Sequence, residues 1–333
     1  MNAKLLPTVG ISCGDPNGIG IEVILKSLKD PTCLDLVTPV IYCNYKLIDY
    51  QNKFYGLDLK LQKIEPDSEF IPNKINIVNT HDNNFTIDFG KLTSKGGQIS
   101  FESLELLTRA VKQKRVDFMV TAPINKKNIQ NKEFDFPGHT DYLSKKFDGN
   151  TLMFMISEKL KLALLTDHIP INKVSAKINS VLIKKKISIL NNSLKKDFLI
   201  SNPKIAVLSI NPHVGDEGVI GNEDQKVLVP AVKDIANQGT YVSGPYSADS
   251  FFGSGLYKKF DAVIAAYHDQ GLVPFKTLTF GQGVNFTAGL NVVRTSPDHG
   301  TAYEIAGMNI ADPTSFKNAI YSGFKIFNNR KLN

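Results

Sequence analysis

An α/β fold with largely parallel sheets is the architecture that this 333-residue sequence predicts. Short unbroken apolar runs, bounded by Pro, Gly, Asp and Asn, are typical of strands that are covered on both faces. Segments with helical periodicity alternate with these runs along the chain, as they do in folds built from strand–helix–strand units. The composition is 42% hydrophobic and 21% charged, an ordinary globular balance, and the length suits two domains or one large one.

Strand, turn and helix follow one another near the start of the chain. Residues 8–12 predict a strand and residues 22–28 predict a helix. The glycine-rich turn Gly14-Asp-Pro-Asn-Gly18-Ile-Gly20 connects them, and such turns direct backbone N–H groups toward an anion. The glycine spacing is neither G-x-G-x-x-G nor a P-loop, so a purely structural turn is an alternative interpretation.

Later elements are predicted by their periodicity. Residues 99–114 predict a helix whose apolar face consists of Phe101, Leu104, Leu107 and Val111. Strands are predicted at residues 75–78 and 117–121. Residues 181–196 predict a second amphipathic helix, with an apolar stripe of Val181, Ile187, Leu190 and Leu194.

The charge balance bears on possible partners. The formal net charge is +7, which suits anionic substrates or nucleic acid. The densest lysine group lies in the helix predicted at 181–196, where a solvated helix face explains it, and no nucleic-acid-binding motif accompanies it. We therefore predict no nucleic-acid partner.

The sequence also predicts a cytoplasmic location without a membrane anchor. It contains no apolar run of about 18 residues, and residues 1–7 lack a signal-peptide core. Cys13, Cys33 and Cys43 are odd in number and form no Cys-x-x-Cys pair, which favours a reducing compartment.

Three histidines each follow an apolar run that predicts a buried strand. His168 follows the run from Lys161, His213 the run from Ile205, and His268 the run from Ala262. Ligands of open α/β sheets bind at the carboxyl ends of the strands, so three imidazoles at that edge are a candidate catalytic metal site. The alternative is that they are unrelated polar residues in surface loops.

Two further motifs carry hydrogen-bonding side chains. In Phe136-Pro-Gly-His139-Thr140-Asp141, His139 and Thr140 form a candidate binding pair, and a helix N-cap at Thr140 is an alternative that is compatible with binding. In Tyr267-His268-Asp269-Gln270-Gly271, Asp269 is placed to orient the neighbouring imidazole or to transfer a proton.

Three polar residues follow at intervals: Lys276, Asn285 and Arg294. A metal, a lysine and an arginine around one cleft suit a small phosphate or carboxylate substrate. Taken singly, Lys276 and Arg294 are also explained as surface charges, and Asn285 as a surface polar residue.

The segment from Thr295 to Gly307 predicts a polar loop that opens a helix. Its His299-Gly300-Thr301-Ala302 sequence is similar to the His-Gly-Ser/Thr-Ala segment of decarboxylating dehydrogenases such as isopropylmalate dehydrogenase. That resemblance implies that these four residues contact the adenine side of a nicotinamide cofactor.

Nearly the whole chain resembles the 4-hydroxythreonine-4-phosphate dehydrogenase family. The matching segments, in chain order, are Gly14–Gly20, Thr121-Ala-Pro-Ile124, Gly138-His-Thr140, Thr166-Asp-His168, Asn211-Pro-His213, Gly244-Pro-Tyr-Ser-Ala-Asp249, Tyr267–Gly271 and Asp298-His-Gly-Thr-Ala302. Two positions depart from the family pattern: Asp141 stands where Glu is common, and Asn17 where Ala is frequent.

The resemblance implies two α/β/α domains of the isocitrate/isopropylmalate dehydrogenase type. We expect residues 1–135 with 285–333 to form the cofactor-side domain, and residues 136–284 to carry the metal ligands and the dimer interface. The implied assembly is a homodimer with active sites shared between subunits. We expect His168 and His213 from one chain and His268 from the other at each site.

The resemblance also implies roles for individual residues. One divalent metal per subunit (zinc, magnesium or cobalt) would bind His168, His213 and His268. Substrate contacts would come from His139, Thr140, Lys276, Asn285 and Arg294. Lys276, Asp269 and Asp249 are the candidate catalytic residues, and the residues alone do not decide between Lys276 and Asp269 as the proton carrier.

The implied activity is oxidation of 4-phosphooxy-L-threonine by NAD or NADP, with decarboxylation to 3-amino-2-oxopropyl phosphate, in pyridoxine 5′-phosphate biosynthesis. A related dehydrogenase acting on phosphorylated four-carbon sugar acids or on a cyclic dihydrodiol is an alternative. A metal-dependent hydrolase is a more remote one. A non-enzymatic basic binding protein leaves the three strand-end histidines unexplained.

Overall fold

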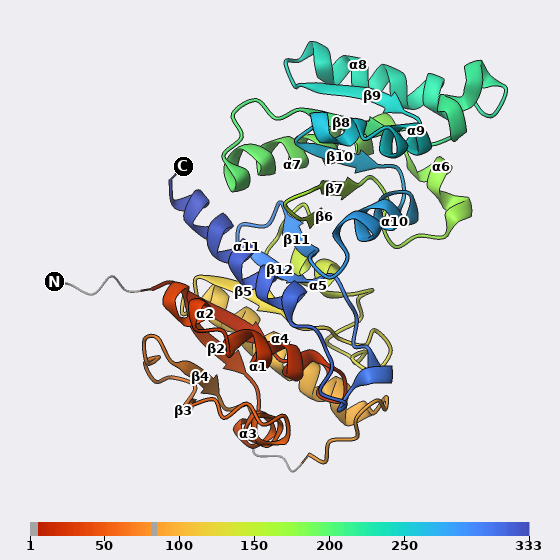
Figure 1. Ribbon diagram of the computed structural model, residues 1–333. Helices are drawn as coiled ribbons and strands as arrows, with labels where there is room; N and C mark the ends of the chain where they lie inside the picture. The colour runs from red at the N-terminus through yellow and green to blue at the C-terminus, as the bar shows by residue number, and fades with distance from the viewer. Residues whose placement is uncertain (1–5, 81–84, 333) are drawn as a thin grey trace. The chain divides into compact units, whose positions relative to one another are not determined.

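The computed structural model describes residues 6–80 and 85–332, and these form two compact units (Figure 1). Unit 1 contains residues 1–148 and 290–328, and unit 2 contains residues 149–289 and 329–333. The sequence-based domain boundaries differ from this division, because helix α5 (His139–Lys146) buries Tyr142 and Leu143 in the core of unit 1. Of the N-terminal segment expected to lack a signal-peptide core, residues 1–5 lie outside the described residues.

Unit 1 is built on a parallel sheet. Its strands run in the order β3-β4-β2-β1-β5-β12, and every pair recorded among them is parallel. They are β1 (Thr8–Ser12), β2 (Thr38–Tyr42), β3 (Leu61–Ile64), β4 (Ile75–Val78), β5 (Phe118–Thr121) and β12 (Arg294–Pro297). The strands predicted at 8–12, 75–78 and 117–121 are confirmed.

Helices lie between most of these strands along the chain. They are α1 (Gly20–Leu28), α2 (Pro31–Leu36), α3 (Tyr45–Phe54), α4 (Ser94–Lys112), α5 and α11 (Thr314–Lys331), and a 3₁₀ turn lies at Tyr303–Ile305. The last residues of α11 belong to unit 2.

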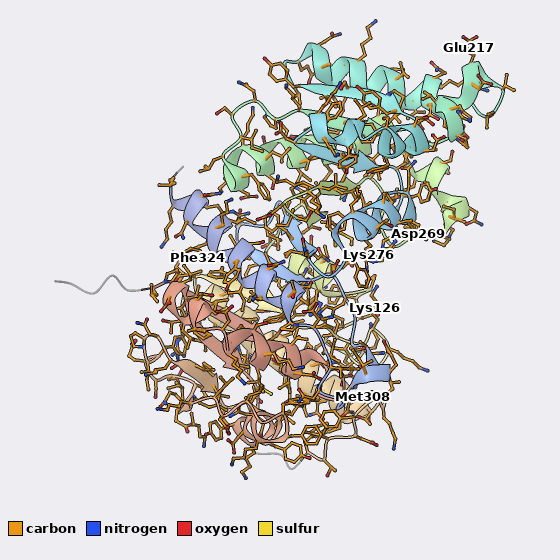
Figure 2. The ribbon with its side chains drawn as sticks, in the orientation of Figure 1. Lys126, Glu217, Asp269, Lys276, Met308 and Phe324 are labelled. Atoms are coloured by element: carbon orange, nitrogen blue, oxygen red, sulfur yellow. The ribbon has the colours of Figure 1, made fainter. Side chains whose placement is uncertain are left out.

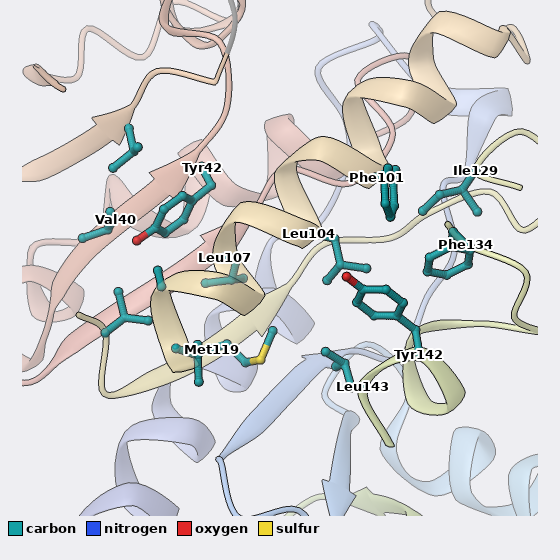
Figure 3. Close-up of a cluster of buried hydrophobic side chains, with 14 of the residues drawn as sticks. Val40, Tyr42, Phe101, Leu104, Leu107, Met119, Ile129, Phe134, Tyr142 and Leu143 are labelled. Atoms are coloured by element: carbon teal, nitrogen blue, oxygen red, sulfur yellow. The ribbon is translucent and has the colours of Figure 1, made fainter. Parts of the chain in front are cut away.

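Helix α4 supplies much of the core of unit 1. The four apolar residues predicted on its face are all buried, and they pack with the aromatic rings of Tyr42, Phe134 and Tyr142 (Figure 3). The rings of Phe134 and Tyr142 are stacked, with centroids 5.1 Å apart. The predicted amphipathic helix is confirmed, and its apolar face anchors α4 against the sheet.

Unit 2 has a mixed sheet in which parallel pairing also prevails. The strands run in the order β11-β6-β7-β10-β8-β9. They are β6 (Leu152–Ile156), β7 (Lys161–Leu164), β8 (Ile205–Leu208), β9 (Val242–Tyr246), β10 (Ala262–Ala265) and β11 (Val284–Ala288). Strand β10 pairs in parallel with β7 and with β8, so the carboxyl ends of these three strands lie at one edge of the sheet.

The remaining elements of unit 2 are helical. They are η1 (Ile171–Lys173), α6 (Val174–Lys177), α7 (Ser180–Phe198), η2 (Pro212–Gly218), η3 (Asp224–Leu228), α8 (Val229–Asn237), α9 (Ala248–Gly253), η4 (Leu256–Lys259) and α10 (His268–Thr279). In α7 the predicted stripe is wrong at one end, since Val181 is 76% exposed and Ile183 is buried instead. Ile183 lies one helical turn before Ile187, so the two share a face, whereas Val181 does not.

One alternative interpretation and one prediction are wrong. Helix α5 begins at His139, and its N-cap residue is Gly138, which makes no side-chain cap bond, so Thr140 is already inside the helix. The segment from Thr295 does not open a helix directly. It completes β12 and reaches a 3₁₀ turn, and the next α-helix begins at Thr314.

Within residues 6–80 and 85–332, no helix combines the length and the apolar character needed to cross a membrane.

Candidate functional site

The buried carboxylate of Asp15 organises the glycine-rich turn of unit 1. Asp15 is fully buried and lies between β1 and α1. Its Oδ1 accepts a hydrogen bond from Asn17 N (2.9 Å), and its Oδ2 accepts from Asn128 Nδ2 (2.6 Å) and from the Tyr303 hydroxyl (2.7 Å). Burial, and then the contact with Asp15, raise the pKa of Tyr303, so its hydroxyl stays protonated and donates. The turn is thereby tied to two distant loops.

The same turn contacts the loop predicted to bind the cofactor. Ile19 N donates to Thr301 O (3.0 Å), and a Cβ at Gly18 would lie 2.6 Å from that oxygen. Only glycine allows this approach. At the neighbouring positions, Ala302 has a left-handed φ of 42°, and His299 Nδ1 lies 3.0 Å from Gly300 O. The four predicted cofactor residues thus form a loop held by the glycine-rich turn.

Asn17, one of the departures from the family pattern, has a structural role. Its Nδ2 donates to Lys91 O and to Thr93 Oγ1, each at 3.0 Å, and its Oδ1 accepts from Asp88 N (2.9 Å). The amide therefore fastens residues 88–93 to the turn.

Unit 1 also contains a cluster of basic side chains. Arg294 on β12 is 2% exposed, and its Nε and Nη2 donate to Thr121 Oγ1 on β5 (3.1 and 2.6 Å). Burial lowers the pKa of this guanidinium, which stays charged near neutral pH. His139 begins α5, and its pKa is well below the ordinary value because of burial and then the positive charges of Arg294 and Lys126. The positive charges of Arg294 and Lys126 thus favour the neutral form of the His139 imidazole.

One nitrogen of the His139 ring lacks a hydrogen-bond partner among the described residues. Its Nε2 atom is buried and has no hydrogen-bond partner among the described residues. A buried polar atom without a partner is costly, so such atoms often mark the place of a ligand. Thr140, the next residue, is half-buried at the same helix start.

In unit 2, two of the three predicted metal ligands lie together. The rings of His168 and His268 have centroids 5.6 Å apart and are tilted by 41°. Asp269 Oδ1 lies 2.7 Å from His268 Nδ1. A carboxylate accepts only, so Nδ1 is the donor in this contact and Nε2 is the ring nitrogen that would bind a metal. Asp167, in contrast, accepts from the backbone N–H of His168 (2.9 Å).

His213 is placed differently. It lies in η2, in a run of left-handed residues that extends to Glu217, and its own φ is 51°. Within the part of the chain that the structure describes, no three His, Cys, Asp or Glu side chains form a group able to hold a metal. His168 and His268 are adjacent within this chain, whereas we expected His168 and His213 of one chain to share a site. Which subunit supplies each ligand stays a prediction.

The remaining predicted residues of unit 2 lie on three elements. Asp249, in α9, accepts from Ser247 Oγ (2.6 Å), and its pKa is lowered chiefly by Ser247 and to a smaller extent by His213. Lys276 is exposed on α10, further along the helix than Asp269 (Figure 2). Asn285, on β11, has a buried Oδ1 without a partner among the described residues.

Sequence reasoning missed Asp15, Lys126, Asn128 and Tyr303. The sequence shows Asp15 only as part of a turn. Its buried role could not be predicted, because Asn128 and Tyr303, which donate to its carboxylate, lie far away in the sequence. Lys126 lies in the segment after β5, and this position at the carboxyl end of a parallel strand was the available signal.

The fold and these loops define the class: an α/β protein with polar, histidine-bearing loops at the carboxyl ends of parallel strands. Residues 35–323 match the family model described as pyridoxal phosphate biosynthetic protein PdxA. The chain belongs to this family.

Individual relatives agree with this assignment. A 4-hydroxythreonine-4-phosphate dehydrogenase from Bacteroides thetaiotaomicron is 45% identical over 97% of this chain and 89% of its own length. The crystal structure of the enzyme of the same name from Klebsiella pneumoniae superimposes with a TM-score of 0.82 at 30% identity, covering 98% of this chain and 99% of that one. A D-threonate 4-phosphate dehydrogenase from Cupriavidus necator is 34% identical, with 98% of both chains covered.

Proposed function

We propose that this protein oxidises 4-phosphooxy-L-threonine, with NAD or NADP as the hydride acceptor, and releases carbon dioxide to give 3-amino-2-oxopropyl phosphate. The reaction serves pyridoxine 5′-phosphate biosynthesis. Family membership and the relatives named as 4-hydroxythreonine-4-phosphate dehydrogenases support this activity. The structural observation that carries the proposal is the buried Arg294 guanidinium together with the buried, unpartnered Nε2 of His139, since a buried cation and an unsatisfied polar atom suit an anionic group such as a phosphate. Lys126 adds a second positive charge that acts on His139.

Each residue of this cluster has a defined contribution. Thr121 holds the Arg294 guanidinium in a fixed orientation, which favours paired hydrogen bonds to an anionic group. His139 is neutral, so its unpartnered Nε2 is available to the substrate, and Thr140 adds a hydroxyl at the same helix start. In unit 2, we propose Lys276 and Asn285 as substrate contacts, and the unpartnered Oδ1 of Asn285 is suited to a substrate N–H or O–H donor.

The histidines of unit 2 fit a divalent cation, because His168 and His268 are adjacent and the contact of Asp269 with Nδ1 of His268 makes Nε2 the ring nitrogen that would face a metal. We propose one zinc, magnesium or cobalt ion per subunit, bound by His168, His268 and His213 of the partner subunit in a homodimer. Such a cation supplies a Lewis acid for a substrate oxygen on which negative charge develops.

The remaining roles concern the cofactor and the protons. His299, Gly300, Thr301 and Ala302 are proposed to bind the adenine side of NAD or NADP, supported by their anchoring on the glycine-rich turn. Asp269 is engaged with the His268 ring, which favours Lys276 as the residue that moves a proton. Asp249 lies close enough to affect His213 electrostatically and remains a candidate catalytic residue.

A direct assay tests the proposal. Purified protein, a divalent cation, 4-phosphooxy-L-threonine and NAD or NADP should yield reduced nicotinamide and carbon dioxide in equal amounts. Non-phosphorylated 4-hydroxythreonine should be a much poorer substrate, because the basic cluster loses its anionic partner. Substrate turnover that needs no nicotinamide would indicate a hydrolase and contradict the proposal.

A second substrate is favoured by a specific observation, the 34% identity to a D-threonate 4-phosphate dehydrogenase. The substrate in the name of that relative, D-threonate 4-phosphate, is like 4-phosphooxy-L-threonine a phosphorylated four-carbon hydroxy acid. Steady-state comparison of the two substrates at equal enzyme concentration decides between them through the ratio of their kcat/KM values.

A further inference from the structure

A chain of hydrogen bonds joins three strand ends in unit 2. Thr166, after β7, donates to Ala266 O from both its backbone N–H (3.2 Å) and its hydroxyl (2.7 Å). Ala266 N, after β10, donates to Gln270 Oε1 (2.7 Å). Gln270 Nε2 in turn donates to Ser209 O, after β8 (2.7 Å). One side chain, that of Gln270, thus connects the ends of β10 and β8.

These contact positions lie just before the three proposed metal ligands. They precede His168 by two residues, His268 by two residues and His213 by four residues. A shift of one strand end relative to its neighbour would therefore move the imidazole that follows it.

Gln270 is chemically suited to this position. Its contacts are a backbone N–H and a backbone C=O, so the residue has to accept at one atom and donate at the other. A primary amide does both without carrying a charge, and the two backbone partners fix which end is oxygen. Ala266 and Ser209 are 0% and 1% exposed, so these backbone groups depend on protein partners.

A second buried side chain fixes the backbone that leads from β8 to His213. Asp224 is fully buried, and its carboxylate accepts from Ile210 N (2.7 Å) and Asn211 N (2.9 Å). Ser209 Oγ donates to Asn211 O (2.8 Å). The end of β8 is therefore fixed on both sides before the chain enters the left-handed run that contains His213.

We propose that Gln270 is a positioning residue for cation binding. It fixes the strand end that carries His268, which with His168 forms the pair of one site, and it also holds the strand end that carries His213, which serves the site of the partner subunit. This inference rests on the metal site proposed above. Gln270 does not touch the cation; it acts through the backbone on either side.

Two substitutions test this role with Co²⁺ as the probe, because its visible absorption reports the geometry of its ligands. Gln270→Met removes both hydrogen bonds at similar volume, and Gln270→Glu keeps the acceptor but loses the donor to Ser209 O. Competition with a chromophoric chelator should show Co²⁺ affinity reduced by about 10- to 100-fold, the usual effect of removing a group that orients metal ligands. The visible spectrum of the remaining complex should change.

Three controls separate the possible results. Thr277→Ala, on the same helix, removes an exposed hydroxyl bonded only to Val273 O among the contacts recorded, and it should bind Co²⁺ like the wild type. His168→Ala should lose the cation. Circular dichroism and unfolding midpoints identify variants that do not fold, and the milder Gln270→Glu carries the test if Gln270→Met is one of them.

The outcomes are distinguishable. Wild-type affinity and spectrum in a folded Gln270 variant, with binding lost in His168→Ala, overturn the positioning role and leave the metal site standing. Wild-type binding in His168→Ala overturns the metal site and the inference with it.

Discussion

Asp269 Oδ1 lies 2.7 Å from His268 Nδ1, and the two residues are neighbours at the start of α10. The contact fixes the imidazole tautomer with its lone pair on Nε2. We predict that Asp269→Asn weakens binding of a divalent cation by about 10-fold or more, because an amide accepts the Nδ1–H bond less strongly and also presents a donor. Calorimetric titration with Zn²⁺ measures the change.

Asp167→Asn is the matched control for this prediction. Asp167 also precedes a proposed ligand in sequence, yet it accepts from the backbone N–H of His168 rather than from a ring. Its replacement should therefore affect cation affinity less. Equal losses in both variants would show that the ring contact of Asp269 has no special importance.

Much of the sheet could be predicted because its strands are buried on both faces. The apolar runs from Lys161, Ile205 and Ala262 begin where β7, β8 and β10 begin. The order of the strands in the sheet could not be predicted in the same way, since an apolar run does not show which strands it pairs with. The adjacency of His168 and His268 depends on β7 pairing with β10, so it emerged only from the structure.

The start of α4 shows why helix boundaries were harder to predict. The predicted helix began at residue 99, whereas α4 begins at Ser94, after Thr93 caps it by accepting from Gly96 N. Gly96 and Gly97 have low helix propensity, so the sequence does not predict that the first turn of α4 is helical. A Cβ at Gly97 would lie 1.9 Å from Asn128 O, so a tertiary contact overrides the propensity.

We predict that His139 makes stability depend on pH. Its pKa in the folded protein is well below the ordinary 6.5, so below about pH 6.5 the unfolded chain binds the proton first. The stability contributed by neutral His139 is therefore present above that pH and is lost as pH falls, at up to about 1.4 kcal/mol per pH unit. His139→Gln should show a flatter dependence of its urea midpoint between about pH 7.5 and pH 5, and identical slopes would contradict the prediction.

We predict that Gly18→Ala impairs use of the nicotinamide cofactor more than use of the substrate. The added methyl group would lie 2.6 Å from Thr301 O and would push the loop of residues 299–302 away from the glycine-rich turn. A displacement that costs about 1.4 kcal/mol of cofactor binding raises its KM about tenfold. Gly253→Ala is the control, because a Cβ there meets nothing within 4 Å. If the cofactor KM of folded Gly18→Ala is unchanged, the loop of residues 299–302 does not contribute to cofactor binding.

The pairing of His168 with His268 in one chain makes a sharp prediction for mixed dimers. If each site takes this pair from one subunit and His213 from the other, then His168→Ala mixed with His213→Ala gives one intact site per mixed dimer. That site has His168 and His268 from the second variant and His213 from the first.

The expected result is recovery of activity to about half of the wild-type value per mixed dimer, if the two sites act independently. His168→Ala mixed with His268→Ala should remain inactive, because each chain's own pair is then broken. The opposite pattern would show that His268 is the shared ligand, as we first expected from the sequence. Recovery in neither mixture, with subunit exchange verified by mass spectrometry, would place all three ligands in one chain and refute the shared site.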